Sequence, residues 1–473
     1  MYEDLHLAFH EIDFIVPVHR FNIQYSYVTK ERLSFIREFV LRIVQLSPLK
    51  PNQIATYLGL NKEELNEALS DLMSTGDLEI SESGDILLTP QSEDYFEDLG
   101  KLPKTSSIME TSSILSFEIG GFNCLGSRRI RDNWKFGIAL NVDNEIVANS
   151  ANHAKTTFQR KFYQYYDKEW LKGMKSDSNE KPTIYSFDSV NKLGQDSLRL
   201  TNLFKIDLEG NPLERDDYES LENSNEVNKL VTKALSIDGS RTNIPEVAEA
   251  MKAIGDNWTV QFFNNSSIDV PAFTAKRAES EMNPKIPLPL VGPAYTKENW
   301  KLVLESIKKA NEVSKKSNNP KVSRLTWIAP SDKYWGKSSR LKTVIDDLKN
   351  FANTRSKKPQ KLYEAEIFLP VPDTNDKQAI RRWLNDFGKE SAFIKGLLEG
   401  FLNGCVEVIF MEDQFVTVLY HLTKPDLLPV TMPVGFMSKD KSIVRKIQSL
   451  VNDYVDGMRS FDQPNNLGSL ALV

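Results

Sequence analysis

Three successive segments between residues 30 and 100 carry apolar side chains at helical spacing. The first predicts a helix that ends at Ser47-Pro48, and the second predicts a short helix closed by a glycine. The third begins after Asn61, and Glu64 follows at the spacing of a capping box. A polar turn flanked by apolar residues at 78–88 predicts a two-stranded hairpin. The apolar positions of the first and third helices are Leu33, Phe35, Ile36, Phe39, Val40, Ile43, Val44 and Leu46, and Leu65, Ala68, Leu69, Leu72 and Met73.

The segment IATYLGLNKEELNEALSDLMSTGDLE, with the helix before it and the hairpin after it, resembles the winged helix-turn-helix family. The resemblance covers residues 30–90 and implies that the third helix stands where that family has its recognition helix. We therefore predict a first domain at residues 1–100, which consists of a winged helix and an N-terminal segment that docks onto a core.

Composition changes after this domain. Residues 94–113 are acidic and then rich in Ser and Thr, which is typical of a linker. Residues 114–270 predict a mixed α/β domain, with strands at 134–142 and 200–208. A cluster of prolines then predicts an extended crossing segment and a boundary, and it comprises Pro271, Pro284, Pro287, Pro289 and Pro293.

Helical and strand patterns alternate through residues 295–460, which predicts an α/β layered domain with a partly parallel sheet. The predicted elements are helix 297–317, strand 323–329, helix 338–351, strand 362–371, helix 376–402, hairpin 405–421, strand 430–436 and helix 441–458. The layout of RLTWIAPSDKYWGKSSRLKTVIDDLKN and PVGFMSKDKSIVRKIQSLVNDYV resembles the phospholipase D-like fold, including its inactive sensory versions in transcription regulators. That family's catalytic motif is His-x-Lys with a following aspartate, and here Lys424 follows His421 at the wrong spacing.

The chain has 473 residues, enough for about three domains, so the fold class is an α/β multidomain protein. Apolar residues make up 40% and charged residues 26%, which excludes disordered and fibrous classes. The start is acidic and no apolar run reaches the roughly 18 residues of a membrane span, so we predict a cytoplasmic protein that has no membrane partner. Two cysteines, Cys124 and Cys405, cannot form a disulfide framework.

No catalytic signature emerges from the motifs. His153-Ala154-Lys155 fits His-x-Lys, but Arg160 stands where the aspartate is needed. On a helix, His6 and His10 would share one face as a metal pair, although the apolar residues around them favour a core-packing segment. Neither glycine motif of phosphate-binding loops occurs. We therefore predict no catalytic residues, no metal site and no cofactor.

Charge is distributed unevenly. Residues 301–361 contain 16 Lys or Arg and 5 Asp or Glu, a local charge of +11, in a chain whose net charge is −6. Basic side chains neutralise phosphates and aromatic rings stack on bases, so this composition predicts a surface that binds DNA or RNA. The alternative is an ordinary solvated face. The predicted nucleic-acid-binding residues are Arg128, Arg129 and Arg131 in a smaller patch, and Lys308, Lys309, Lys315, Lys316, Lys321, Arg324, Lys333, Trp335, Lys337, Arg340 and Lys342.

The winged-helix segment has the opposite charge, with 6 basic and 14 acidic residues between positions 30 and 100. Phosphates of the major groove would repel a recognition helix that carries this many acids. We predict that this module binds protein, either a partner or the basic half of its own chain, through Glu63, Glu64, Glu67 and Asp71.

Together these features predict a non-enzymatic nucleic-acid-binding or adaptor subunit of a bacterial multiprotein system, with phage defence or DNA maintenance as its setting. One alternative is a phosphodiesterase or nuclease with an unrecognised active site, which a bound divalent metal would favour. Another is a transcription regulator with a ligand-sensing phospholipase D-like domain, which specific operator binding would favour.

Overall fold

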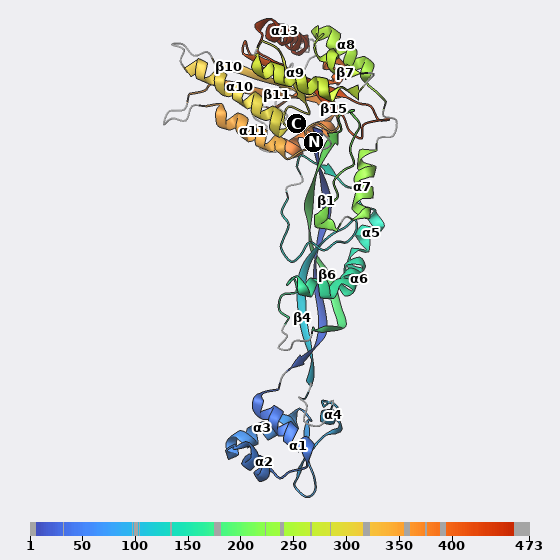
Figure 1. The fold of residues 1–473 in the computed structure, drawn as a ribbon, viewed down its shortest axis with the longest axis vertical. Coiled ribbons are helices and arrows are strands. Elements are labelled where there is room, and N and C mark those ends of the chain that lie inside the picture. The colour runs from blue at the N-terminus through green and yellow to red at the C-terminus, as the bar shows by residue number, and fades with distance from the viewer. Residues whose placement is uncertain are drawn as a thin grey trace.

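The computed structural model describes residues 6–457 except for 32, 97, 99–102, 104, 133–134, 175–180, 223, 237–240, 265–266, 284, 316–321, 354–359, 374–375 and 388–393. Its shape is elongated (Figure 1). A large head lies at one end, a long β-ribbon extends from it, and a small helical module lies at the far end of the ribbon. We call these parts the head, the stalk and the tip module.

The stalk is built around β1 (Leu7–Glu31), a strand of 25 residues that spans about 80 Å at roughly 3.3 Å per residue. It pairs antiparallel with β6 (Thr183–Ile206) along most of its length and with β4 (Thr105–Glu118) along its outer half. A short strand, β5 (Ile138–Ala139), pairs parallel with it near the head. Because His10 lies in β1, the helical spacing of His6 and His10 does not place two imidazoles on one face of a helix.

One face of the stalk is covered by helix α6 (Ser150–Asp167), which follows the short helix α5 (Asn144–Ala148). Alternate residues of β1, among them Phe21 and Tyr25, are buried against Phe158 and Phe162 of α6. This period of two is the pattern of a strand with one covered face. The predicted linker is wrong for its second half, because Ser- and Thr-rich residues 105–113 form the paired strand β4. Of the predicted strand 134–142, only β5 is present.

The tip module comprises residues 33–96 and is inserted between β1 and β4. The predicted helices and hairpin are present, as α1 (Phe35–Leu46), α2 (Pro51–Leu58), α3 (Lys62–Ser74), β2 (Leu78–Ile80) and β3 (Ile86–Leu88), followed by α4 (Pro90–Glu93). The capping box at Asn61 and Glu64 is confirmed, since each side chain accepts from the other residue's backbone N–H at 2.9 Å. Phe35 and Leu46 were expected in the core, but they are exposed.

The head contains a seven-stranded sheet in the order β12-β11-β10-β13-β14-β15-β9. Strands β10, β11 and β12 are parallel and the other neighbours are antiparallel, which confirms a partly parallel sheet. The strands are β9 (Leu288–Val291), β10 (Ser323–Ile328), β11 (Tyr363–Val371), β12 (Ile394–Leu398), β13 (Val406–Met411), β14 (Phe415–Leu422) and β15 (Met432–Ser438).

Both faces of this sheet are covered, so the head has three layers (Figure 1). On β13, Val408 and Phe410 pack into one core, and Ile409 and Met411 pack into the other. One layer consists of α10 (Lys297–Lys315), α11 (Arg340–Phe351) and α12 (Lys377–Phe387). The other consists of α8 (Ile244–Ile254), α9 (Val270–Met282) and α13 (Lys441–Gly457), while α7 (Asn225–Leu235) lies beside the root of the stalk. The root of the stalk packs into the same core as Val408 and Phe410, through Phe9, Ile12, Phe14, Leu200 and Phe204.

The predicted helix 376–402 is wrong in its second half, because residues 394–398 form β12. The remaining short elements are η1 (Glu219–Leu221), η2 (Thr259–Phe262), η4 (Phe401–Gly404), β7 (Phe263–Asn264) and β8 (Ser267–Ile268). None of the helices in the described part of the chain has the length and hydropathy needed to cross a bilayer.

Candidate functional site

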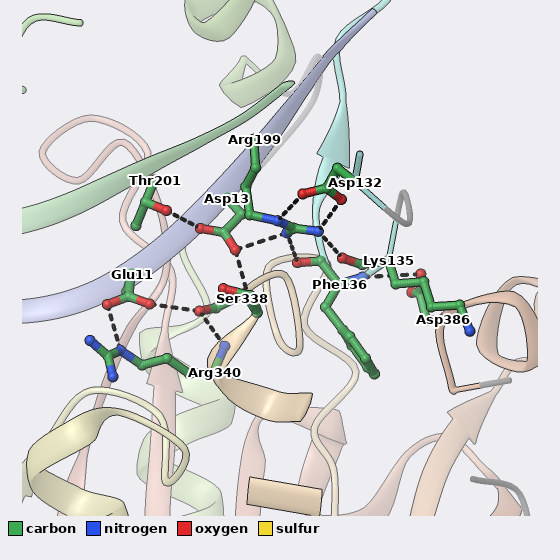
Figure 2. A network of polar contacts seen from close by, with 11 residues as sticks. Glu11, Asp13, Asp132, Lys135, Phe136, Arg199, Thr201, Ser338, Arg340 and Asp386 are labelled. Atoms are coloured by element: carbon green, nitrogen blue, oxygen red, sulfur yellow. Dashed lines mark hydrogen bonds and ion pairs between the residues drawn. The ribbon is translucent and has the colours of Figure 1, made fainter. Parts of the chain in front are cut away.

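The stalk joins the head through a polar network around Asp13 of β1 (Figure 2). Asp13 is fully buried, and its Oδ2 accepts from Arg199 Nη1 at 2.9 Å and from the backbone N–H of Ser339 at 2.7 Å. Its Oδ1 accepts from the hydroxyl of Thr201 at 2.6 Å. The guanidinium of Arg199 also donates to Asp132 at 2.8 Å. These contacts hold two stalk strands against the loop that precedes α11.

A second group of ion pairs extends this junction (Figure 2). Glu11 accepts from Arg340 Nε at 2.7 Å and from the Ser338 hydroxyl at 2.8 Å. Lys337 donates to Asp386 at the end of α12 at 3.2 Å. Lys337 and Arg340 were predicted to contact nucleic acid. The structure places Arg340 in an ion pair that joins the head to the stalk and Lys337 in an ion pair within the head.

Glu407 of β13 is the centre of a buried polar cluster beside this junction. Its Oε1 accepts from the indole N–H groups of Trp327 at 3.0 Å and Trp335 at 2.9 Å, and its Oε2 accepts from the backbone N–H of Ala294 at 3.1 Å. Trp335 has 0% of its surface exposed. The prediction that Trp335 contacts nucleic acid is therefore wrong, because a ring inside the core cannot stack on a base.

His421 of β14 lies between two carboxylates of this cluster. Its Nδ1 is 2.8 Å from Asp332 Oδ2 and its Nε2 is 3.3 Å from Glu407 Oε2. Burial disfavours the charged imidazole, but the hydrogen bonds to Asp332 and Glu407 outweigh burial and raise the pKa of His421 to about 9. Burial disfavours the charged form of Asp332 as well, yet its contacts with His421 keep the pKa of Asp332 below the usual value. His421 is therefore an imidazolium at neutral pH.

The structure brings no nucleophile and base together as a catalytic pair among the residues described above. Burial raises the pKa of Cys124 to about 12 and that of Cys405 to about 11, so both thiols stay protonated at neutral pH. His153 is exposed and contacts the ring of Phe122. Within the described ranges, no group of three His, Cys, Asp or Glu side chains has the arrangement of a metal site.

The predicted lysines of α10 lie on its exposed side. Lys308, Lys309 and Lys315 are exposed, and Lys308 lies 4.5 Å from the centre of the Phe351 ring. Lys342 is exposed on α11. Lys316 and Lys321 lie outside the described residues.

The remaining predicted cations are more dispersed. Arg324 lies 3.7 Å from Glu366, an acid outside the basic segment, so part of the local charge is compensated within the protein. Lys333 lies over the ring of Tyr334 at 4.5 Å. In the loop before β5, Arg128 and Arg131 are exposed, and Arg129 pairs with Asp196 at 3.3 Å.

A lysine outside the predicted set joins the α10 group. Lys439 follows β15, and its side chain is exposed but partly surrounded by protein. This partial burial, together with the charge of Lys309, lowers the pKa of Lys439. Glu305 opposes this effect without cancelling it. We call Lys308, Lys309, Lys315 and Lys439 the lysine edge. The proximity of Lys309 and Lys439 could not be inferred from positions 130 residues apart in the sequence.

The four acids predicted to bind a partner differ in their surroundings. Glu64 accepts from the backbone N–H of Asn61 in the capping box, and Asp71 forms an ion pair with Arg37 of α1. Glu63 and Glu67 are exposed on α3 and take part in neither contact. Two of the four acids thus support the local structure, and two are available at the surface.

The chain matches no protein-family model, and comparison with curated proteins and with solved structures finds no significant match. The resemblances to the winged-helix and phospholipase D-like families stay predictions.

Proposed function

We propose that the protein is a non-catalytic adaptor in a nucleic-acid-handling assembly. In this proposal, the lysine edge of the head contacts phosphates and the acidic face of the tip module docks a basic protein partner. The observation that carries the proposal is the arrangement of opposite charges at the two ends of one continuous strand, β1, which runs from the core of the head to the tip module (Figure 1).

The lysine edge has the electrostatics of a phosphate-binding surface. The pKa of Lys439 is lowered by its partial burial and, in addition, by the charge of the nearby Lys309. Two like charges held near each other repel, and a phosphate between them relieves that repulsion. The lysines of α10 also lie on a regular helix whose opposite side is buried, so their backbone positions are fixed.

The tip module supports the second half of the proposal. Glu63 and Glu67 project from α3, where a DNA-reading winged helix would present cations or amides to the groove. Exposed carboxylates instead complement a basic protein surface, where they raise the association rate and the specificity. The hydrogen bond of Asp13 with the Ser339 backbone and the ion pair of Glu11 with Arg340 fix the stalk to the head, so the two binding surfaces are held far apart.

The test uses the full chain and a variant that reverses Lys308, Lys309 and Lys439 to Glu. Fluorescence polarisation with single-stranded and duplex DNA and with RNA, at 50 to 200 mM salt, should show at least tenfold weaker binding by the variant. The slope of log K against log salt should also become shallower, by roughly 0.9 for each duplex phosphate that the variant no longer neutralises. Lys252→Glu on α8, which packs on the opposite face of the sheet, is the matched control. Equal binding by the triple variant would overturn the proposal, and hydrolysis of the probes would favour the nuclease alternative.

A further inference from the structure

The head contains a cavity of about 660 Å³ that none of the features above explains. Its walls come from the loop after β10, the turn that leads into β13, the end of β14 with the loop to β15, the C-terminal end of α7, the residue before α8, and the segment that contains Arg215. The side chains that matter for the argument are Arg215, Asn243, Ser331, Asp332, Lys333 and His421. A volume of this size falls in the range of pockets that hold small organic ligands.

The cavity lies where the topology of an α/β sheet favours a ligand. Strand β10 has the parallel strand β11 on one side and the antiparallel strand β13 on the other. The chain that leaves β10 passes to β11, so its loop separates from β13 and leaves space at this edge. Ligands of α/β proteins bind in such crevices, at the carboxyl ends of strands where the connection changes direction.

Strained backbone borders the same space. Leu402, Asn403 and Gly404 have φ values of 46°, 61° and 73°, and Asn403 and Gly404 line the cavity. Left-handed conformations cost free energy for residues that have a Cβ, and they persist where the surrounding structure enforces them. The turn is held in place because the Gly404 carbonyl accepts from the backbone N–H of Ser331 at 2.7 Å.

The charges that line the cavity favour an anion. Arg215 and Lys333 are cationic, and Asp332 is the one acid that lines the cavity within the described residues. The imidazolium of His421 is already compensated by Asp332 and Glu407. Both oxygens of Asp332 already accept hydrogen bonds, Oδ1 from the Tyr334 backbone and Oδ2 from His421 and the Thr431 hydroxyl. The acid is therefore occupied by protein donors.

Two cationic donors have capacity left for a ligand. Arg215 Nη2 donates to Thr232 at 3.0 Å, and its Nη1 has no hydrogen-bond partner among the described residues. Nη1 is closed off from the cavity, so the guanidinium has to turn before Nη1 can donate to a ligand oxygen. That contact would remove the cost of a buried donor that lacks an acceptor. Lys333 lies over the Tyr334 ring and makes no ion pair within the described ranges.

We propose that this cavity binds a small phosphate monoester, with Arg215 and Lys333 as the phosphate-binding residues. A guanidinium offers paired N–H donors and a lysine adds a point charge, which is a common combination for a phosphate dianion. Leu235, Leu428 and Val430 form an apolar part of the wall that suits the organic portion of the ligand. The site is separate from the lysine edge and does not depend on the adaptor function.

Calorimetry and thermal unfolding of the full chain test the proposal, with AMP, adenosine and inorganic phosphate as probes. AMP should bind with one-to-one stoichiometry and raise the unfolding temperature, inorganic phosphate should compete with it at millimolar concentration, and adenosine should not bind. Arg215→Gln and Lys333→Gln should each weaken AMP binding at least tenfold. Lys333 is exposed, so its variant is expected to fold even if the Arg215 variant does not.

Two controls separate this site from the lysine edge. Lys342→Gln on α11, and the variant with Lys308, Lys309 and Lys439 reversed to Glu, should bind AMP like the wild type. Hydrogen exchange should slow in residues 331–334 and 402–405 when AMP is present. The proposal is overturned if neither AMP nor phosphate binds at millimolar concentration, if adenosine binds as well as AMP, or if Lys333→Gln leaves the affinity unchanged.

Discussion

His10 and His421 are both buried and interact electrostatically, yet their pKa values shift in opposite directions. Burial lowers the pKa of His10 to about 4, and its Nε2 has no hydrogen-bond partner among the described residues. His421 has two carboxylate partners, which outweigh burial and raise its pKa to about 9. A neutral and a charged imidazole therefore coexist at neutral pH. Asp332 and Glu407 act on both histidines, but only His421 forms hydrogen bonds with them, and this accounts for the difference.

The raised pKa of His421 predicts a loss of stability at alkaline pH. A group whose pKa is higher in the folded state stabilises the fold fully below its ordinary pKa of 6.5, and this contribution is lost as pH rises through about 9. A shift of this size corresponds to on the order of 3 kcal/mol. Urea unfolding at pH 6, 7.5 and 9 should show the loss in the wild type and in His153→Gln, an exposed histidine that serves as control. His421→Gln should start less stable and show a flatter profile; equal alkaline losses in all three proteins would refute the assignment.

Two aspartates of the stalk pair with arginines, and we expect their removal to lower the free energy of unfolding by very different amounts. Asp13 is 0% exposed and its partner Arg199 is 18% exposed, whereas Asp196 is 10% exposed and its partner Arg129 is 55% exposed. Removing Asp13 leaves Arg199 paired with Asp132, but it takes the acceptor from the Ser339 N–H and the Thr201 hydroxyl. A buried donor left without its acceptor costs about 1–3 kcal/mol, while an ion pair with an exposed member contributes about 0–1 kcal/mol. Asp13→Ala should therefore lower the free energy of unfolding far more than Asp196→Ala. Similar losses in urea titrations of the two variants would contradict this description of the junction.

Elements that depend on local signals could be predicted from the sequence. The tip module has caps, a turn and helical periodicity within consecutive residues, and its helices and hairpin were predicted almost to their ends. The stalk has no such signal, because β1 pairs with strands about 90 and 170 residues away. Strand β4 consists largely of Ser and Thr, whose polar character suggests a linker, although threonine is a good strand former.

The candidate surfaces were predicted less well, because they also depend on contacts between residues that are far apart in the sequence. Arg340 was counted as free positive charge, but its partner Glu11 is 329 positions away in the sequence. Trp335 lies between lysines in the sequence, yet the fold turns its ring toward Glu407. Counting charges along a chain cannot show which of them the tertiary structure neutralises.

A substitution at Trp335 can distinguish the predicted role in base stacking from the buried position that the structure shows. Trp335→Phe removes one of the two indole donors of Glu407 Oε1 and should destabilise the fold by about 1–3 kcal/mol. If the ring stacked on a base instead, the same change would cost about 1–3 kcal/mol of binding free energy. We expect unfolding to become easier while nucleic-acid affinity, measured where the variant is folded, stays within twofold of the wild type. The reverse result would restore Trp335 to the binding surface.

We expect different acids of α3 to support the stability of the tip module and the binding of a partner. Glu64 completes the capping box, so Glu64→Lys should lower the stability of the tip module by about 1 kcal/mol, because it removes the hydrogen bond with Asn61 and places an unfavourable charge at the helix N-terminus. Glu63 and Glu67 are exposed and lie off the buried face formed by Leu65, Leu69 and Leu72.

Reversing Glu63 and Glu67 to Lys should therefore leave thermal unfolding nearly unchanged and weaken capture of a basic protein partner, mainly by slowing association. Pull-down of the partner by the full chain, followed by association rates at low and high salt, measures this. The Glu64→Lys variant controls for loss of helix stability. If duplex DNA binds tightly and sequence-selectively to the wild-type chain, and the double variant binds it with altered selectivity, then the tip module reads DNA and the regulator alternative takes the place of the adaptor.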